Sequence, residues 1–260
     1  MKLGILTIAT NRYLEYYSEL VRSLFDNYSE VPEIEWYLFT DRVSDAIAIN
    51  QRHPTLKITI IPITGYGFPQ ATLYRYKIYA EHKEKLNADI LMHLDADMLI
   101  RSNRFYELVS AAVKKAPLCL VRHPGFYRPQ GIEAVKFYAS HPNFFLRDLL
   151  RIVKNGSLGD WETSKKSTAF VSRDKRNTYY CGGIWFGLNG SIKEMCDVLS
   201  SSVELDEKHG VMAKWHDESH LNKYATEFIV NSLTPELCFD PSYPNLEDLD
   251  EIVRAVDKNA

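Results

Sequence analysis

A run of mostly apolar residues at positions 91–94 leads directly into two carboxylates, Asp95 and Asp97. The run predicts a buried strand whose carboxyl end reaches a cleft, which is where parallel α/β sheets bind ligands. In extended backbone the i, i+2 spacing sends both carboxylates to the same side. Because neighbouring carboxylates repel one another, we predict a divalent cation, Mn²⁺ or alternatively Mg²⁺, that bridges them to a phosphate. Most chance Asp-x-Asp triplets are solvated turns, and it is the preceding apolar strand that favours a metal site.

Composition limits the classes of protein. A chain of 260 residues with 45% hydrophobic and 25% charged residues predicts one globular α/β domain. The net charge of −3 gives no general attraction for nucleic acid, so we expect no nucleic-acid partner. No secretory leader or transmembrane segment is predicted, which together with the cysteines favours the cytoplasm. Four scattered cysteines predict reduced, buried thiols: Cys119, Cys181, Cys196 and Cys238.

Strand-like and helix-like patterns alternate along the chain, and this predicts a mainly parallel sheet flanked by helices. No G-x-G-x-x-G follows the first strand and no Walker A lysine is present, which argues against dinucleotide redox enzymes and P-loop ATPases. A double glycine interrupts the last predicted strand, and such glycines often mark a close approach by another group, such as a sugar ring. The strands are predicted at residues 3–9, 36–41, 57–61, 91–94, 118–121 and 179–187, and the helices at residues 17–25, 71–86, 103–113, 133–153 (in two parts) and 191–199.

The segment from Trp215 to His220 concentrates aromatic, acidic and imidazole side chains. Asp217 or Ser219 could serve as a helix N-cap, but that role explains a single residue. A zinc site on His216 and His220 lacks an identifiable third ligand. A carbohydrate site explains more, because Trp215 offers an apolar face to a sugar ring and a carboxylate can stabilise an oxocarbenium-like carbon.

These motifs resemble glycosyltransferase family 6, which includes the histo-blood-group A and B transferases and α-1,3-galactosyltransferase. The resemblance implies a GT-A fold, with residues 1–100 as the nucleotide-binding half and residues 101–260 as the acceptor-binding and catalytic half of a single domain. The chain is similar to a soluble microbial or viral member of the family. The matching motifs are residues 36–41, 95–98, 123–127, 179–183 and 215–224.

The resemblance also implies roles for individual residues. Glu218 would be the catalytic carboxylate and an acceptor contact, while Asp95 and Asp97 would hold the metal. Residues 128–159 are longer than the corresponding loop of the family, which leaves the role of Asp160 open. The acceptor site would further include His123, Trp215 and Asp240. The donor site would consist of Ile8, Ala9, Thr10, Tyr13, Arg75, Asp95, Ala96, Asp97, Cys181, Gly182, Gly183, Asp217 and Lys258.

The function implied is a retaining, metal-dependent transfer of GalNAc from UDP-GalNAc to a galactoside, in α-1,3 linkage. In the family, the residue matching Gly183 faces the C2 substituent of the donor, where a glycine accompanies the N-acetyl group; Gly125 points the same way. The alternatives are transfer of galactose from UDP-Gal, a non-catalytic carbohydrate-binding protein and a metal-dependent hydrolase. The expected partners are a UDP-sugar and an oligosaccharide or glycolipid acceptor, either plain or α-1,2-fucosylated. A lipid-linked acceptor would bring the protein into peripheral contact with a membrane.

Overall fold

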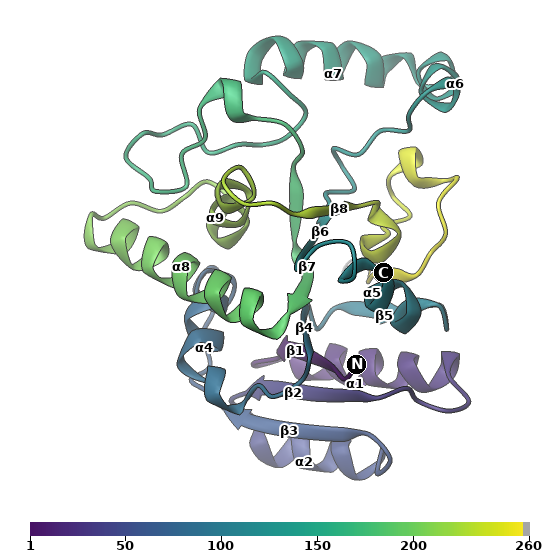
Figure 1. Cartoon of the computed structure of the whole chain (residues 1–260), viewed down its shortest axis with the longest axis vertical. Coiled ribbons are helices and arrows are strands. Elements are labelled where there is room, and N and C mark those ends of the chain that lie inside the picture. The colour runs from purple at the N-terminus through teal and green to yellow at the C-terminus, as the bar shows by residue number, and fades with distance from the viewer. Residues whose placement is uncertain (257–260) are drawn as a thin grey trace.

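A seven-stranded sheet forms the centre of the computed structural model, which describes residues 1–256 (Figure 1). The strand order is β3-β2-β1-β4-β7-β6-β8. The strands are β1 (Leu3–Ile8), β2 (Ile34–Thr40), β3 (Lys57–Pro62), β4 (Ile90–Leu94), β6 (Leu118–Arg122), β7 (Tyr180–Leu188) and β8 (Asn231–Leu233). The predicted α/β fold of the GT-A type is confirmed.

One strand departs from the parallel arrangement. β1 pairs in parallel with β2 and β4, and β2 with β3, whereas β7 is antiparallel to both β4 and β6. The chain leaves the sheet at the carboxyl end of β6 and returns at the same edge, where His123 N–H donates to the Tyr179 carbonyl at 2.9 Å. The amino end of β7 therefore lies beside the carboxyl end of β4, directly behind the two aspartates.

Helices cover both faces of the sheet (Figure 1). Apolar residues of α1, α2 and α5 pack in the core on one face, and those of α4, α8 and α9 pack on the other. A two-stranded sheet of β5 (Met98–Ile100) and β9 (Val253–Ala255) extends the fold beyond β4. The helices are α1 (Tyr13–Asn27), α2 (Val43–Gln51), α3 (Gln70–Leu73), α4 (Arg75–Glu81), α5 (Phe105–Ala112), α6 (Ile132–Ser140), α7 (Pro142–Asn155), α8 (Asn189–Lys208) and α9 (His216–Ala225).

Several predicted helix boundaries were wrong. The helix expected over residues 71–86 breaks at Tyr74 into α3 and α4, which leaves Arg75 at the first position of α4. α8 continues past residue 199 to Lys208, since Val203 and Asp206 in the added part are buried. α9 begins at His216 with Trp215 as N-cap, so Asp217 and Ser219 lie inside the helix and not at its cap.

Two further predictions can be compared with the fold. All four cysteines are buried and free, as expected. Within residues 1–256, no helix combines the length and the apolar character needed to cross a bilayer.

Candidate active site

Asp95 and Asp97 lie in the tight turn between β4 and β5, whereas the sequence predicted extended backbone there. Two backbone hydrogen bonds fix this turn: Asp95 N–H donates to the Gly183 carbonyl at 3.0 Å, and Val256 N–H donates to the Asp97 carbonyl at 2.9 Å. The turn is thus held by β7 on one side and by the chain after β9 on the other. Both aspartates line the same cavity.

This first hollow has a volume of about 370 Å³ and lies over the carboxyl ends of β1 and β4. Seven of the predicted donor-site residues line it: Ile8, Thr10, Tyr13, Arg75, Asp95, Ala96 and Asp97. Ala9 was also predicted there, but its side chain is fully buried in the core, because successive residues at a strand end face opposite sides. The sequence did not identify the part of the lining that comes from Asn11, Arg12, Tyr66, Gly67, Phe68, Ala71, Thr72 and His93.

Arg75 connects the aspartate turn to the acidic pair of α9. Its guanidinium is buried, with Nη2 3.3 Å from Asp95 Oδ1 and Nε 3.2 Å from Asp217 Oδ2. Its Nη1 also donates to the Gly182 carbonyl at 2.6 Å. The planar fork of arginine suits such divided contacts, and the two carboxylates raise its pKa despite burial. The sequence showed no cationic neighbour for the aspartates, and the structure supplies one from a distant helix.

His93, on β4, is a buried member of the same cluster that the sequence did not single out. Its Nε2 lies 2.6 Å from Arg75 Nη1 and 3.0 Å from Asp95 Oδ1, and its Nδ1 lies 2.8 Å from the Tyr79 hydroxyl. Burial, followed by the charge of Arg75, lowers its pKa to about 4. His93 is therefore a neutral imidazole at neutral pH. The available signal was a histidine inside an otherwise apolar strand, two residues before the first aspartate.

A second hollow of about 510 Å³ adjoins the first, and both are lined by Phe68, Thr72, Arg75 and Asp95. The two acidic centres consequently belong to one continuous site. The other residues of the second hollow are His123, Phe126, Arg151, Asp160, Gly182, Gly183, Trp215, His216, Asp217, Glu218 and Tyr243.

Asp217 and Glu218 occupy the first turn of α9, at the floor of the second hollow. Glu218 Oε2 accepts a hydrogen bond of 2.8 Å from Gly182 N–H, which aims the carboxylate at the start of β7. Burial raises the pKa of Asp217 and of Glu218 to about 7 each, against the opposing charge of Arg75. Two carboxyl groups that titrate near neutrality in a cavity are typical of a reactive site.

The rim of this hollow offers groups suited to a sugar. Trp215 is 46% exposed, and its indole N–H donates to Asp160 Oδ2 at 2.6 Å, while Lys214 pairs with the other oxygen of Asp160. His123 Nδ1 accepts from Gly125 N–H at 3.0 Å, and burial lowers the pKa of His123 to about 4. The neutral ring therefore carries its proton on Nε2. Asp160, whose role the sequence left open, is a full member of the site.

Besides Ala9, two predicted contacts lie outside both hollows. The Cys181 side chain is buried in the core, where it is hydrogen-bonded to the free thiol of Cys238, because β7 alternates its faces and directs Cys181 away from the cavity. The Asp240 carboxylate accepts from Ser242 N–H at 2.9 Å and lies near His123, but it does not line the described part of either hollow. Lys258 falls beyond the described residues.

The glycines at the start of β7 allow carboxylates to approach the strand. A Cβ at Gly182 would come within 3.0 Å of Asp217 Oδ2. A Cβ at Gly183 would come within 2.9 Å of Asp95 Oδ2 and 3.0 Å of Met98 Cε. The sequence assigned Gly183 to the space beside the sugar; in the structure that position also sets how closely Asp95 can lie to the sheet.

The donor atoms of the turn suit a hard cation. Carboxylate oxygens are the ligands that Mn²⁺ and Mg²⁺ accept, and such ions complete their coordination with substrate phosphate and water. No cluster of three or more His, Cys, Asp or Glu side chains with metal-site geometry occurs in residues 1–256. The alternative zinc site is not formed, since His216 packs on Phe68 while His220 is buried beside Asp206.

Comparison with known proteins adds to this geometry. The family model described as Glycosyltransferase family 6 matches residues 153–260, which include β7 and α9. The chain is 24% identical to the histo-blood group ABO system transferase 1 of Rattus norvegicus, over 85% of this chain and 56% of that protein. It is 23% identical to the globoside alpha-1,3-N-acetylgalactosaminyltransferase 1 of Homo sapiens, over 94% of this chain and 62% of that protein. It is 25% identical to the O-antigen biosynthesis glycosyltransferase WbnI of Escherichia coli, over 86% of this chain and 82% of that protein.

Proposed function

We propose that this chain, whose predicted resemblance to glycosyltransferase family 6 is confirmed by these matches, transfers a hexose from a UDP-sugar to a galactoside. The observation that carries the proposal is the contact of Arg75 with both Asp95 and Asp217. This contact connects the turn of Asp95, whose carboxylates suit a metal-bound diphosphate, to the buried acidic pair of α9. A transfer between two substrates requires that both sites belong to one cavity. The chain spans 56–62% of the ABO and globoside relatives, so their activities are only a guide to its own.

The first hollow is the proposed donor site. Ile8, Thr10 and Tyr13 would face the uridine, while Asp95 and Asp97 would hold Mn²⁺ against the diphosphate. When bound, such an ion neutralises charge on the departing UDP. The guanidinium of Arg75 pairs with Asp95, and the neutral imidazole of His93 lies against both groups without adding a charge.

Glu218 is the proposed catalytic residue. It lines the second hollow, where the Gly182 N–H orients its carboxylate toward the start of β7. In its ionised form it can stabilise positive character at the anomeric carbon, either as a nucleophile or as the partner of a front-face ion pair. Both routes retain the anomeric configuration, which is the outcome proposed here.

The acceptor would bind at the rim of the second hollow. The exposed indole of Trp215 offers an apolar face, and Asp160 and His123 offer an acceptor and a donor for sugar hydroxyls. GalNAc is the proposed donor sugar, because in the family a glycine at the position of Gly183 accompanies the N-acetyl group. A human relative is also named as a globoside N-acetylgalactosaminyltransferase. An α-1,2-fucosylated galactoside is the proposed acceptor, and the cytoplasm the proposed compartment.

The test is a screen of UDP-GalNAc and UDP-Gal, with and without Mn²⁺, against α-fucosylated and plain galactosides. We expect UDP-GalNAc to give the higher kcat/KM and NMR to show a product with retained α configuration. A higher kcat/KM with UDP-Gal would overturn the donor assignment alone. An inverted product would overturn the mechanism. A non-catalytic carbohydrate-binding protein would bind galactosides but not UDP, and a hydrolase would release free sugar without acceptor as fast as it transfers.

A further inference from the structure

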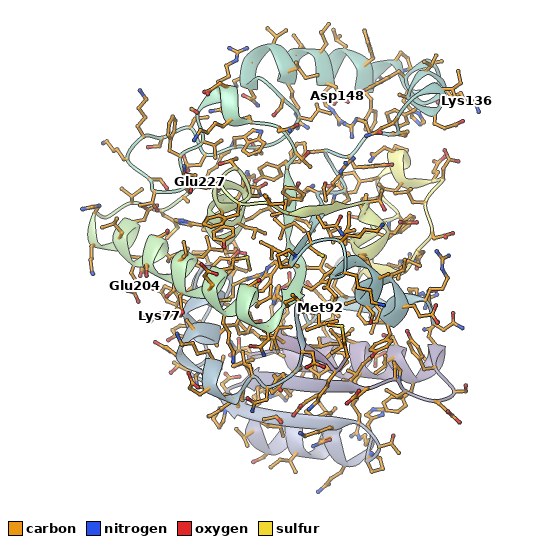
Figure 2. All side chains as sticks on the ribbon, in the orientation of Figure 1. Lys77, Met92, Lys136, Asp148, Glu204 and Glu227 are labelled. Carbon is orange, nitrogen blue, oxygen red and sulfur yellow. The ribbon has the colours of Figure 1, made fainter. Side chains whose placement is uncertain are left out.

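α7 is amphipathic in the reverse sense to an ordinary surface helix. Its buried position is Asp148, which is held by Arg128 through Nε at 2.5 Å and Nη2 at 2.9 Å. Asp148 lies on the side of α7 toward the body of the molecule (Figure 2). The polar face of the helix is thus directed inward, where an ion pair fixes it.

The apolar face of α7 is in solvent. Leu146, Leu150 and Val153 are 59%, 61% and 64% exposed, and the i, i+4, i+7 spacing places them on one side of the helix. Phe145 and Leu149 widen this side of α7, and α6 adds Ile132 and Val135, all of them at least 47% exposed. We call this set of seven residues the α6–α7 apolar face. Contiguous exposed apolar surface of this kind marks an interaction site.

The charges of the segment that carries the apolar face are mainly positive. Residues 128–156 contain five Lys or Arg and two Asp or Glu, although the whole chain has a net charge of −3. Asp148 is neutralised by Arg128, and Glu133 by Lys136 at 2.7 Å, while Arg147 and Lys154 are exposed beside the apolar residues. An apolar helix face with a basic edge is complementary to an anionic bilayer surface.

The position of α7 in the molecule agrees with this complementarity. α6 and α7 lie at one end, and α1, α2 and the strands β1–β3 lie at the other (Figure 1). Arg151, on the inner side of α7, lines the second hollow. The proposed acceptor site is therefore separated from the α6–α7 apolar face by about one helix diameter, roughly 10–12 Å.

We propose that the α6–α7 apolar face docks on an anionic lipid bilayer, with α7 lying in the plane of the interface. Such helices bury their apolar face by about 5–10 Å, a depth that leaves the second hollow at the level of the headgroups. The arrangement suits an acceptor carried on a lipid, and this consequence rests on the proposed function. Docking itself does not depend on sugar transfer and is measured without it.

The experiment is co-sedimentation of the full 260-residue chain with vesicles of phosphatidylcholine, with or without phosphatidylglycerol. The test variant is Leu146→Ser/Leu150→Ser/Val153→Ser, which leaves the charge unchanged. The matched control removes three exposed apolar residues from other surfaces, Ile47→Ser/Val198→Ser/Ile229→Ser. Thermal unfolding, and UDP binding in the presence of Mn²⁺, show that each variant is folded.

We expect the wild type and the control to bind vesicles that contain phosphatidylglycerol, and to bind less at high salt. The α7 variant should lose at least about tenfold in partition, because three apolar side chains no longer leave water on binding. Wild type that stays in the supernatant, or an α7 variant that binds as wild type does, would overturn the proposal. A wild-type dimer in sedimentation velocity that the α7 variant converts to monomer would assign the face to a second copy instead. If the wild type binds vesicles but transfers no sugar, that result would count against the proposed function and leave the docking surface in place.

Discussion

Asp95 is held between Arg75 and His93, and Asp97 lies two residues further along the same turn. We expect Asp95→Asn and Asp97→Asn each to lower kcat/KM by about a hundredfold or more, because neutralising the departing diphosphate contributes several kcal/mol. EDTA should abolish transfer by wild type, and Mn²⁺ should restore it. Asp197→Asn, which removes a surface carboxylate paired with Lys83, is the control and should retain full activity. Full activity after thorough chelation would contradict the metal assignment.

Glu218 must be ionised to stabilise positive charge, and burial raises its pKa to about 7. We therefore expect kcat/KM of wild type to rise with pH and to level off above about 7, a profile that reports ionisation in the free enzyme. Glu218→Gln should lower kcat far more than it weakens donor binding, since the charge acts mainly in the transition state. Steady-state kinetics and UDP-sugar titration separate the two effects. A flat profile between about pH 5 and 9, two units on either side of the pKa, would argue against this role.

The same raised pKa has a consequence for stability. Because the pKa of folded Glu218 lies above its ordinary value of 4.5, the stabilising protonated form is fully present below pH 4.5 and is lost as pH rises through about 7. Glu218→Gln should thus raise the free energy of unfolding at alkaline pH by up to about 3 kcal/mol. In acid it should change the free energy of unfolding little. Thermal unfolding without donor, compared on both sides of neutrality, measures the difference. If Glu218→Gln shifted the unfolding temperature equally at both pH values, the cause would be a change in packing and not the ionisation of Glu218.

At the scale of elements, the amino end of β7 controls how Asp95 is placed. A Cβ in Gly183→Ala would press on Asp95 Oδ2 and on Met98. We expect preference to move from UDP-GalNAc toward UDP-Gal by roughly tenfold to a hundredfold. The contact with Asp95 adds a second expectation, a higher Mn²⁺ concentration for half-maximal activity.

Two measurements distinguish these effects of Gly183→Ala. Donor preference is taken from kcat/KM ratios at saturating Mn²⁺, and metal affinity from a Mn²⁺ titration with one donor. Gly190→Ala is the control, because a Cβ at that position meets nothing within 4 Å. An unchanged donor ratio together with weaker metal binding would assign Gly183 to Asp95 placement alone.

At the scale of the whole molecule, Arg75 joins parts of the chain that are far apart in sequence. It begins α4 and contacts Asp95 after β4, Asp217 on α9 and the Gly182 carbonyl on β7. We expect Arg75→Lys to lower the free energy of unfolding by about 3 kcal/mol or more, because one ammonium cannot replace the fork and a buried carboxylate would lose its partner. Urea unfolding measures this, with Arg104→Lys, an exposed partner of Asp250, as the near-neutral control. A change below 1 kcal/mol, about the size expected of an exposed pair, would show that Arg75 is not needed for the fold.

Local patterns in the sequence were enough to predict the alternating strands and helices, the buried cysteines and the strand that leads to Asp95 and Asp97. Such features depend on neighbours along the chain, because hydrophobic periodicity and turn residues act over a few positions. The tertiary structure decided the rest. The reversed direction of β7 follows from a return at the same sheet edge; it places Gly183 against Asp95 and turns Cys181 toward the core. The outward apolar face of α7 follows from the buried pair of Asp148 and Arg128. Which carboxylates meet Arg75, and which side of a helix is buried, depend on burial and ion pairing between distant segments, and local periodicity carries no information about these contacts.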